Sequence, residues 1–161
     1  MTEKTRIVLT VNGRDVEAWV TTNQPLSEVL RHVAGQTDVK YGCGEGVCGT
    51  CTVLLDGDPV NSCLIFAVQA DGSDVTTLQG VAGPDGSLGA LQRSFLRHGG
   101  SQCGFCTPGM VLTAHWYVGR NPDTDREGIR KALAGNFCRC TGYGKIIDAV
   151  EAYAEEAGRV G

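Results

Sequence analysis

The stretch of sequence that decides the fold is Tyr41-Gly-Cys-Gly-Glu-Gly-Val-Cys-Gly-Thr-Cys51. Three of its residues are cysteines, and glycines stand at positions 42, 44, 46 and 49. Glycine permits a positive φ and a close approach of the backbone, so this loop can curl tightly around a bound group. Its backbone N–H groups can then point inward at sulfur atoms. A fourth cysteine, Cys63, follows after eleven further residues.

The spacing of these four cysteines is C-x4-C-x2-C-x11-C. The first three follow the spacing of plant-type 2Fe–2S ferredoxins. We therefore predict that Cys43, Cys48, Cys51 and Cys63 hold a 2Fe–2S cluster. The alternative is a structural zinc site, which usually combines two short C-x2–4-C pairs. Only one end of this loop has that form, and Cys63 stands alone, so iron–sulfur is favoured.

A second group of four cysteines follows, in Cys103-Gly-Phe-Cys106 and Cys138-Arg-Cys140. Its spacing alone leaves two interpretations open, because four thiolates suit either zinc or an iron–sulfur cluster. The C-x2-C pair could also be a redox-active dithiol, although that reading leaves the other six cysteines unexplained. Both segments lie at the ends of predicted helices, and two such loops can meet at one point.

The residues around the first group predict a small α+β, ubiquitin-like domain over residues 1–78. Residues 6–11 and 15–20 read as strands joined by an Asn12-Gly13 turn. Apolar residues recur at helical spacing in residues 25–34. Residues 50–55 read as a further strand. Residues 79–87, rich in glycine and with Pro84, are predicted to be a linker.

After the linker, the apolar pattern becomes helical over residues 88–161. We predict four helices, near residues 87–97, 107–119, 124–135 and 145–157, and thus a small helical bundle. Ser87 and Thr124 are the expected N-caps of the first and third helices, and Thr107-Pro108 is expected to open the second.

Composition excludes several classes of function. The net charge is −4 and no basic stripe is present, which argues against nucleic acid or an anionic membrane as partner. No apolar run approaches the roughly 20 residues of a membrane span, and the N-terminus does not read as a signal peptide. We therefore expect a cytoplasmic protein, where eight cysteines would bind metal rather than form disulfides.

Three segments resemble the iron–sulfur subunits of molybdenum hydroxylases, a family that includes xanthine dehydrogenases, aldehyde oxidoreductases and carbon monoxide dehydrogenases. They are the loop 41–51, Gln102-Cys-Gly-Phe-Cys-Thr-Pro-Gly-Met110 and Gly135-Asn-Phe-Cys-Arg-Cys-Thr-Gly-Tyr143. The resemblance implies a β-grasp ferredoxin-like domain followed by a four-helix bundle. It also implies a second 2Fe–2S cluster, held by Cys103, Cys106, Cys138 and Cys140.

The resemblance also implies partners. The helical-domain cluster would lie near the molybdopterin of a large subunit, with Gln102 and Cys140 in contact with the pterin. The other cluster would lie toward FAD on a medium subunit. The expected function is electron transfer from molybdopterin through two clusters to FAD or another acceptor, with no catalytic residue on this chain. The alternative is a free-standing two-cluster ferredoxin-like carrier.

Overall fold

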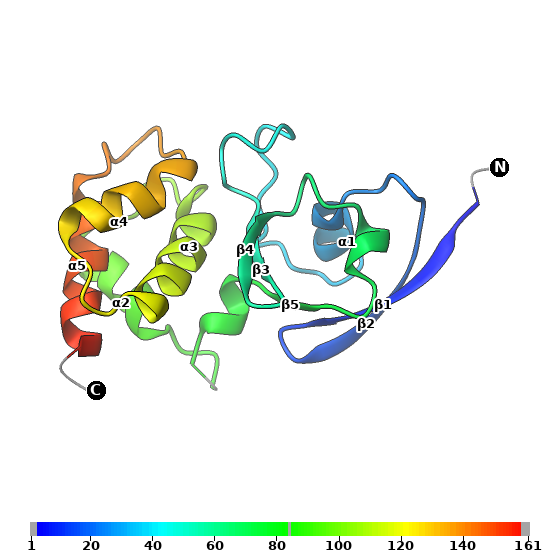
Figure 1. The fold of residues 1–161 in the computed structure, drawn as a ribbon, viewed down its shortest axis with the longest axis horizontal. Helices are drawn as coiled ribbons and strands as arrows, with labels where there is room; N and C mark the ends of the chain where they lie inside the picture. Colours follow the sequence, from blue (N-terminus) through cyan, green and yellow to red (C-terminus); the bar gives the residue numbers. More distant parts are fainter. Residues whose placement is uncertain (1–2, 84, 159–161) are drawn as a thin grey trace.

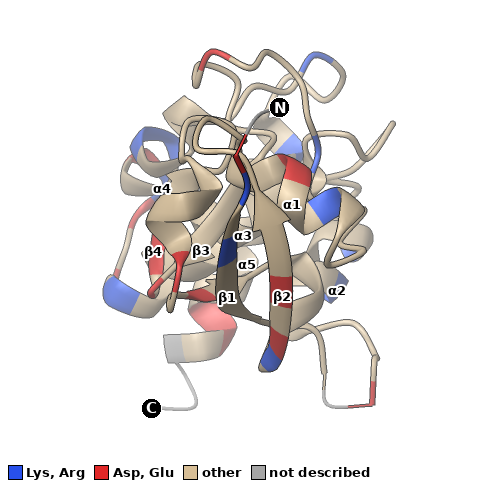
Figure 2. Cartoon of the chain, turned by 90° about the vertical axis from the view of Figure 1, so that its right-hand side faces the viewer, with Lys and Arg blue, Asp and Glu red and all other residues tan. Residues whose placement is uncertain are grey.

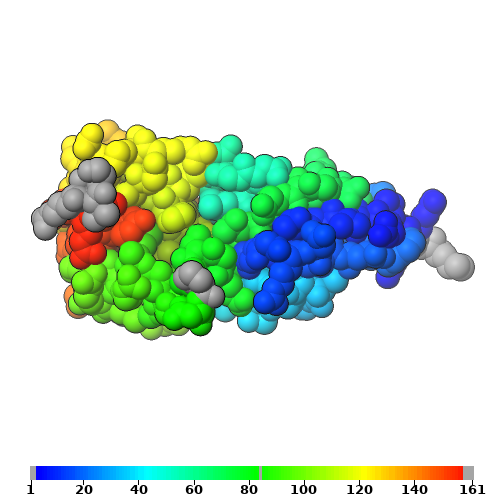
Figure 3. Space-filling model, turned by 90° about the horizontal axis from the view of Figure 1, so that it is seen from below, coloured from blue at the N-terminus to red at the C-terminus, as the bar shows by residue number. Residues whose placement is uncertain are grey.

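The computed structural model describes residues 3–83 and 85–158. Pro84, in the predicted linker, and the extreme ends of the two predicted domains lie outside these residues. A sheet with one helix forms one half of the molecule, and the remaining helices form the other (Figure 1). The space-filling view shows the two halves joined along the long axis (Figure 3).

The N-terminal half is a mixed five-stranded sheet with the order β2-β1-β5-β3-β4. Its strands are β1 (Thr5–Val11), β2 (Arg14–Val20), β3 (Thr52–Leu55), β4 (Asp58–Asn61) and β5 (Asp74–Thr76). β1 pairs with β5 in parallel, and the other pairs are antiparallel. The sheet and the helices together confirm the α+β class, and the strand order is compatible with the predicted β-grasp.

Alternation of side chains places the core of this half between the sheet and helix α1 (Leu26–His32). Ile7, Leu9 and Val11 of β1 are buried, while their neighbours are at least partly exposed. The complete core consists of Ile7, Leu9, Val11, Ala18, Val20, Leu26, Val29, Leu30, Val39, Val53, Ala67, Ala70 and Val75. Short 3₁₀ segments at Ala67–Ala70 and Leu78–Val81 complete the half.

The C-terminal half contains α2 (Ala90–Arg97), α3 (Thr107–Arg120), α4 (Arg126–Ala132) and α5 (Gly144–Gly158). A 3₁₀ turn, Leu133–Gly135, follows α4. The described residues thus hold five α-helices, of which four follow the sheet. Their shared core is Leu91, Phe95, Cys106, Met110, Val111, Ala114, Val118, Ile129, Leu133, Ile146, Ile147, Ala149, Val150 and Ala154.

Two predicted helix starts were wrong by a few residues. α2 begins at Ala90 after Gly89 rather than after Ser87, and the Gln92 side chain accepts a hydrogen bond from the Gly89 N–H. α4 is capped by Asp125, whose carboxylate accepts from the Gly128 N–H. Thr124 instead directs its hydroxyl to the Tyr117 phenol. Thr124 and Asp125 are adjacent and both belong to residue types that cap helices. At α2 the cap is Gly89, a weaker capping residue than Ser87 two positions earlier, so capping preference alone did not locate the start.

The two halves meet where α3 packs against β3 and β4. At the edge of this contact, Asp58 accepts hydrogen bonds from the Trp116 indole at 3.1 Å and from Arg120 at 2.9 Å.

Acidic and basic segments are interspersed on the sheet end of the molecule (Figure 2). Within the described residues, the longest helices are too short or too polar to cross a bilayer.

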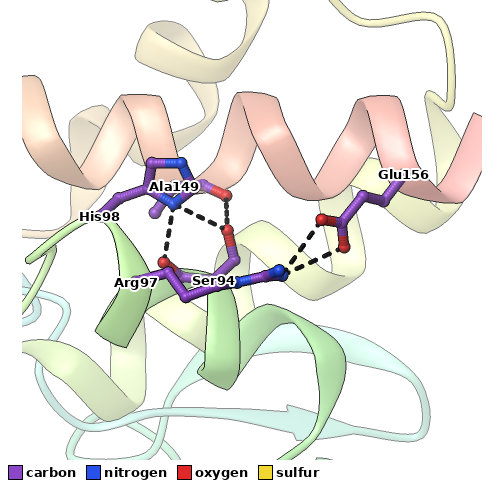
Figure 4. A network of polar contacts seen from close by, with 5 residues as sticks. All are labelled: Ser94, Arg97, His98, Ala149 and Glu156. Carbon is purple, nitrogen blue, oxygen red and sulfur yellow. Dashed lines mark hydrogen bonds and ion pairs between the residues drawn. The ribbon is translucent and has the colours of Figure 1, made fainter.

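Two polar contacts of different depth join α2 to α5 (Figure 4). The hydroxyl of Ser94, which is fully buried, donates to the Ala149 carbonyl at 2.7 Å. At the surface, Arg97 pairs with Glu156 at 3.1 Å. His98 lies beside the serine, with its Nδ1 2.9 Å from the Ser94 carbonyl oxygen.

We expect Ser94→Ala to lower the free energy of unfolding by about 1–2 kcal/mol, because a buried hydrogen bond is lost. Arg97→Ala, which removes only the exposed ion pair between the same helices, serves as the control and should cost much less. Denaturant unfolding of both variants measures the difference. Equal losses would contradict the importance of the buried hydroxyl.

Candidate metal centres

The first cysteine loop wraps its backbone around the Cys43 sulfur. Gly44, Gly46 and Gly49 adopt the positive φ expected from the sequence. Gly42 does not; it is needed for close approach, since a Cβ there would meet the Thr50 hydroxyl oxygen at 2.8 Å. The Glu45 N–H donates to the Cys43 Sγ at 3.3 Å. The loop therefore presents backbone donors to sulfur, as its composition predicts.

The thiols of this half approach one another as two pairs. Cys43 interacts with Cys48, and Cys51 interacts with Cys63 and, more weakly, with Cys48. Asn61 fastens the loop, because its amide donates to the Gly46 carbonyl at 2.9 Å. Cys51 is buried, while the other three thiols are only partly buried.

The two ends of this site have opposite electrostatic character. The Glu45 N–H, with the Cys48 thiol and the N–H groups of Cys48 and Val47, lowers the pKa of Cys43 to about 6. Burial raises the pKa of Cys51 to about 11. Near neutral pH the metal-free loop therefore carries a thiolate at Cys43 and a protonated thiol at Cys51. Binding of a metal by Cys51 must release the proton of that thiol.

The second group of cysteines also forms two pairs. The Cys140 thiol donates to the Cys103 sulfur at 3.5 Å, and both residues are exposed. Cys106, just before α3, is buried and interacts with Cys138. The loops before α3 and after α4 thus meet, as their predicted positions at helix ends require.

In each of these pairs one thiol is acidified and the other is not. The Phe105 N–H and the Cys140 thiol lower the pKa of Cys103, while its proximity to Cys103 raises the pKa of Cys140. Burial raises the pKa of Cys106 to about 12. Burial opposes ionisation of Cys138, but hydrogen bonds from the Thr141 hydroxyl, from the N–H groups of Thr141 and Cys140, and from the Cys106 thiol together lower its pKa.

The chemistry of the donors fits iron–sulfur clusters. Each half of the molecule provides four free cysteines. Four thiolates are the ligands that a 2Fe–2S cluster takes. The donor set therefore fits one 2Fe–2S cluster in each half.

Comparison with known proteins agrees with this reading. Residues 9–77 match the 2Fe–2S iron-sulfur cluster binding domain family, and residues 77–151 match the 2Fe–2S binding domain family. The nicotinate dehydrogenase small FeS subunit of Eubacterium barkeri is 50% identical over 95% of this chain and 96% of its own. The chain belongs to the iron–sulfur subunits of the molybdenum hydroxylases.

Two further relatives differ in length. The crystal structure of quinoline 2-oxidoreductase from Pseudomonas putida 86 contains a chain that superposes with a TM-score of 0.92. That chain is 46% identical, with coverage of 99% of this subunit and 98% of its own length. The aldehyde oxidoreductase of Megalodesulfovibrio gigas is 44% identical over 89% of this subunit, which spans only 16% of that longer protein.

The subunit brings its two cysteine loops into direct contact. The Phe137 N–H donates to the Cys48 carbonyl at 2.8 Å. The Asn136 side chain, 4% exposed, donates to the Gly49 carbonyl at 3.0 Å. Neither Gly49 nor Gly109 could carry a side chain here, since a Cβ on Gly49 would collide with the Gly135 carbonyl and one on Gly109 with the Gly49 carbonyl.

The sequence predicted the cysteines of both sites, but not the residues that join the two loops or that place a hydroxyl beside a sulfur. Asn136 lies next to Phe137 in a loop and carries no spacing signal of its own. The hydroxyls of Thr50 and Thr141 lie 3.2 and 3.1 Å from the sulfurs of Cys48 and Cys138. Their closeness in sequence to cysteines is the one signal that could have drawn attention to them. Gln102 is exposed beside Cys103, and its predicted pterin contact stays a prediction.

We expect Asn136→Asp to destabilise the contact between the halves, because a carboxylate would face the Gly49 carbonyl with no proton to donate. The cost should be about 1–3 kcal/mol in the free energy of unfolding. Asn121→Asp is the matched control, since Asn121 also donates its amide to a carbonyl, that of Tyr117, but is exposed. Denaturant unfolding of the iron-loaded chain measures both, and equal effects would contradict the clamp.

Proposed function

We propose that this subunit holds two 2Fe–2S clusters and serves as the electron-transfer subunit of a cytoplasmic molybdenum hydroxylase. When bound, the clusters supply one-electron transfer between molybdopterin on a large subunit and FAD, or another acceptor, on a further partner. The ferredoxin-like domain is residues 1–78, the linker 79–87, and the helical domain, a four-helix bundle, 88–161. The observation that carries the proposal is that eight free cysteines are arranged as one set of four in each half, each half matching a 2Fe–2S binding domain family.

The chain's own residues hold and shield the bound groups. Cys43, Cys48, Cys51 and Cys63 would be the ligands in the first half, and Cys103, Cys106, Cys138 and Cys140 in the second. Backbone N–H groups, such as that of Glu45 on the Cys43 sulfur, offset negative charge at the thiolates. Burial of Cys51 and Cys106 keeps water from the inner side of each site.

The exposed side of the second site fits a partner. Gln102, Cys103 and Cys140 all lie at the surface. A centre open to water on this side would be covered once the large subunit docks, which agrees with the proposed contacts of Gln102 and Cys140 with the pterin. That the related aldehyde oxidoreductase carries the equivalent segment within a much longer protein supports such close packing.

The alternative functions are less well supported. A free-standing carrier is disfavoured because this chain matches 96% of the length of a nicotinate dehydrogenase small FeS subunit, which is part of a larger enzyme. A dithiol oxidoreductase would pair Cys103 with Cys106, yet the Cys103 sulfur is contacted by Cys140 instead. A zinc module would need four thiolates around one ion in each half, and it is disfavoured because both halves match 2Fe–2S binding domain families.

The experiment that tests the proposal is determination of iron and acid-labile sulfide, with low-temperature EPR after reduction by dithionite. We expect four irons and four sulfides per chain and two distinct rhombic signals. Zinc in place of two irons would overturn the proposal for the helical half. Co-purification with a molybdopterin-containing subunit tests the partner.

A substitution in one quartet should leave the other intact. We expect Cys43→Ser to remove one EPR signal and about two irons, since each half holds its own ligands. Cys103→Ser is the matched variant and should remove the other signal. Loss of both signals in either variant would refute two independent sites.

A further inference from the structure

Three hydrogen bonds form a closed ring around Cys138. The Thr141 hydroxyl donates to the Cys138 sulfur at 3.1 Å. The Tyr143 N–H donates to the oxygen of that hydroxyl at 3.2 Å. The Cys138 N–H in turn donates to the Tyr143 phenol oxygen at 3.0 Å. Each residue of the ring therefore fixes the next.

The backbone is held in an uncommon conformation to close this ring. Tyr143 has a φ of 69°, a left-handed value that is rare for a residue with a large side chain and that persists only where its surroundings hold it. The phenol of Tyr143 is anchored on the Cys138 N–H, and its N–H is directed at Thr141. These two contacts therefore hold Tyr143 in its left-handed conformation.

The ring fixes the direction of the Thr141 hydroxyl. Its oxygen already accepts from the Tyr143 N–H, so its hydrogen is free to point at sulfur. When Cys138 is a metal-bound thiolate it can only accept, which leaves Thr141 as the donor. The Thr141 N–H adds a longer contact to the same sulfur at 3.5 Å.

A donor to a ligand sulfur acts on reduction potential. One-electron reduction adds one negative charge to a cluster and its four thiolates and breaks no bond. Hydrogen bonds to ionised acceptors are the stronger ones, so the donor stabilises the more negative, reduced form. We propose that Thr141, positioned by Tyr143, raises the potential of the cluster in the helical half, an inference that rests on the proposed function.

Thr50 gives a comparison within the same chain. It is 5% exposed, and its hydroxyl lies 3.2 Å from the sulfur of Cys48. Cys48 also takes part in the contact between the loops, because its carbonyl accepts from the N–H of Phe137, the residue that precedes Cys138. Among the residues that the structure describes, the Thr50 hydroxyl bonds to Cys48 alone, and either atom can be the donor, so its direction is less constrained than that of Thr141. Thr50 accordingly has a smaller effect on reduction potential than Thr141, and it acts on the cluster of the first half.

The test is an EPR-monitored redox titration of the assembled enzyme, with dithionite as reductant. Thr141→Val keeps the shape of the side chain and removes the hydroxyl, and Thr141→Ser restores it. We expect the valine variant to change the ratio of reduced to oxidised helical-half cluster by up to about tenfold at fixed potential, or about 59 mV downward. The serine variant and the other cluster should keep the wild-type midpoint.

An unchanged midpoint in Thr141→Val, or an equal fall in Thr141→Ser, would overturn the inference. Thr141→Ala, with a smaller side chain, takes the place of valine if valine prevents iron loading. If both lose the cluster while serine retains it, the hydroxyl serves assembly and tuning is refuted. Thr50→Val should lower only the midpoint of the first-half cluster, and by less.

The outcome is separable from that of the proposed function. The wild-type enzyme is first required to contain four irons per chain and two EPR signals. Failure there refutes the two-cluster proposal itself. With both clusters present, the midpoint comparison between valine and serine judges Thr141 alone.

Discussion

The contact between the two cysteine loops is the constraint on which the rest of the structure depends. Asn136 is buried and donates to Gly49, while the backbone of Phe137 binds the carbonyl of Cys48. This joins a ligand segment of one half directly to a ligand segment of the other. The contact fixes the separation of the two candidate centres, and α3 packs against β3 to keep the halves in this register.

How far the sequence could predict this molecule depends on the range of each interaction. Cysteine spacing, the Asn12-Gly13 turn and apolar periodicity are local, and they were sufficient to predict two cysteine sites and an α+β chain. Asn136 and Gly49 are 87 positions apart, and nothing in either local sequence indicates the other. Helix starts at Gly89 and Asp125 were also missed, because the residues with capping ability at Ser87 and Thr124 lie within two positions of the actual caps.

The electrostatics of the sites reflect competition between burial and backbone donors. Burial raises the pKa of Cys51 to about 11 and of Cys106 to about 12, and both thiols would have to lose a proton to bind iron. The lowered pKa of Cys43 offers a thiolate first, from a partly exposed position. Metal loading is therefore coupled to proton release at the buried thiols.

The two sides of the helical-half site have different surroundings. On its inner side, Cys106 is buried, and the half-buried Cys138 thiol accepts a hydrogen bond from the Thr141 hydroxyl. On its outer side, Cys103 and Cys140 are exposed. Solvent exposure and hydrogen bonds to sulfur both contribute to the potential of an iron–sulfur centre. Water therefore acts mainly at the outer thiols, whereas the fold of this chain supplies burial and hydrogen bonds at the inner ones.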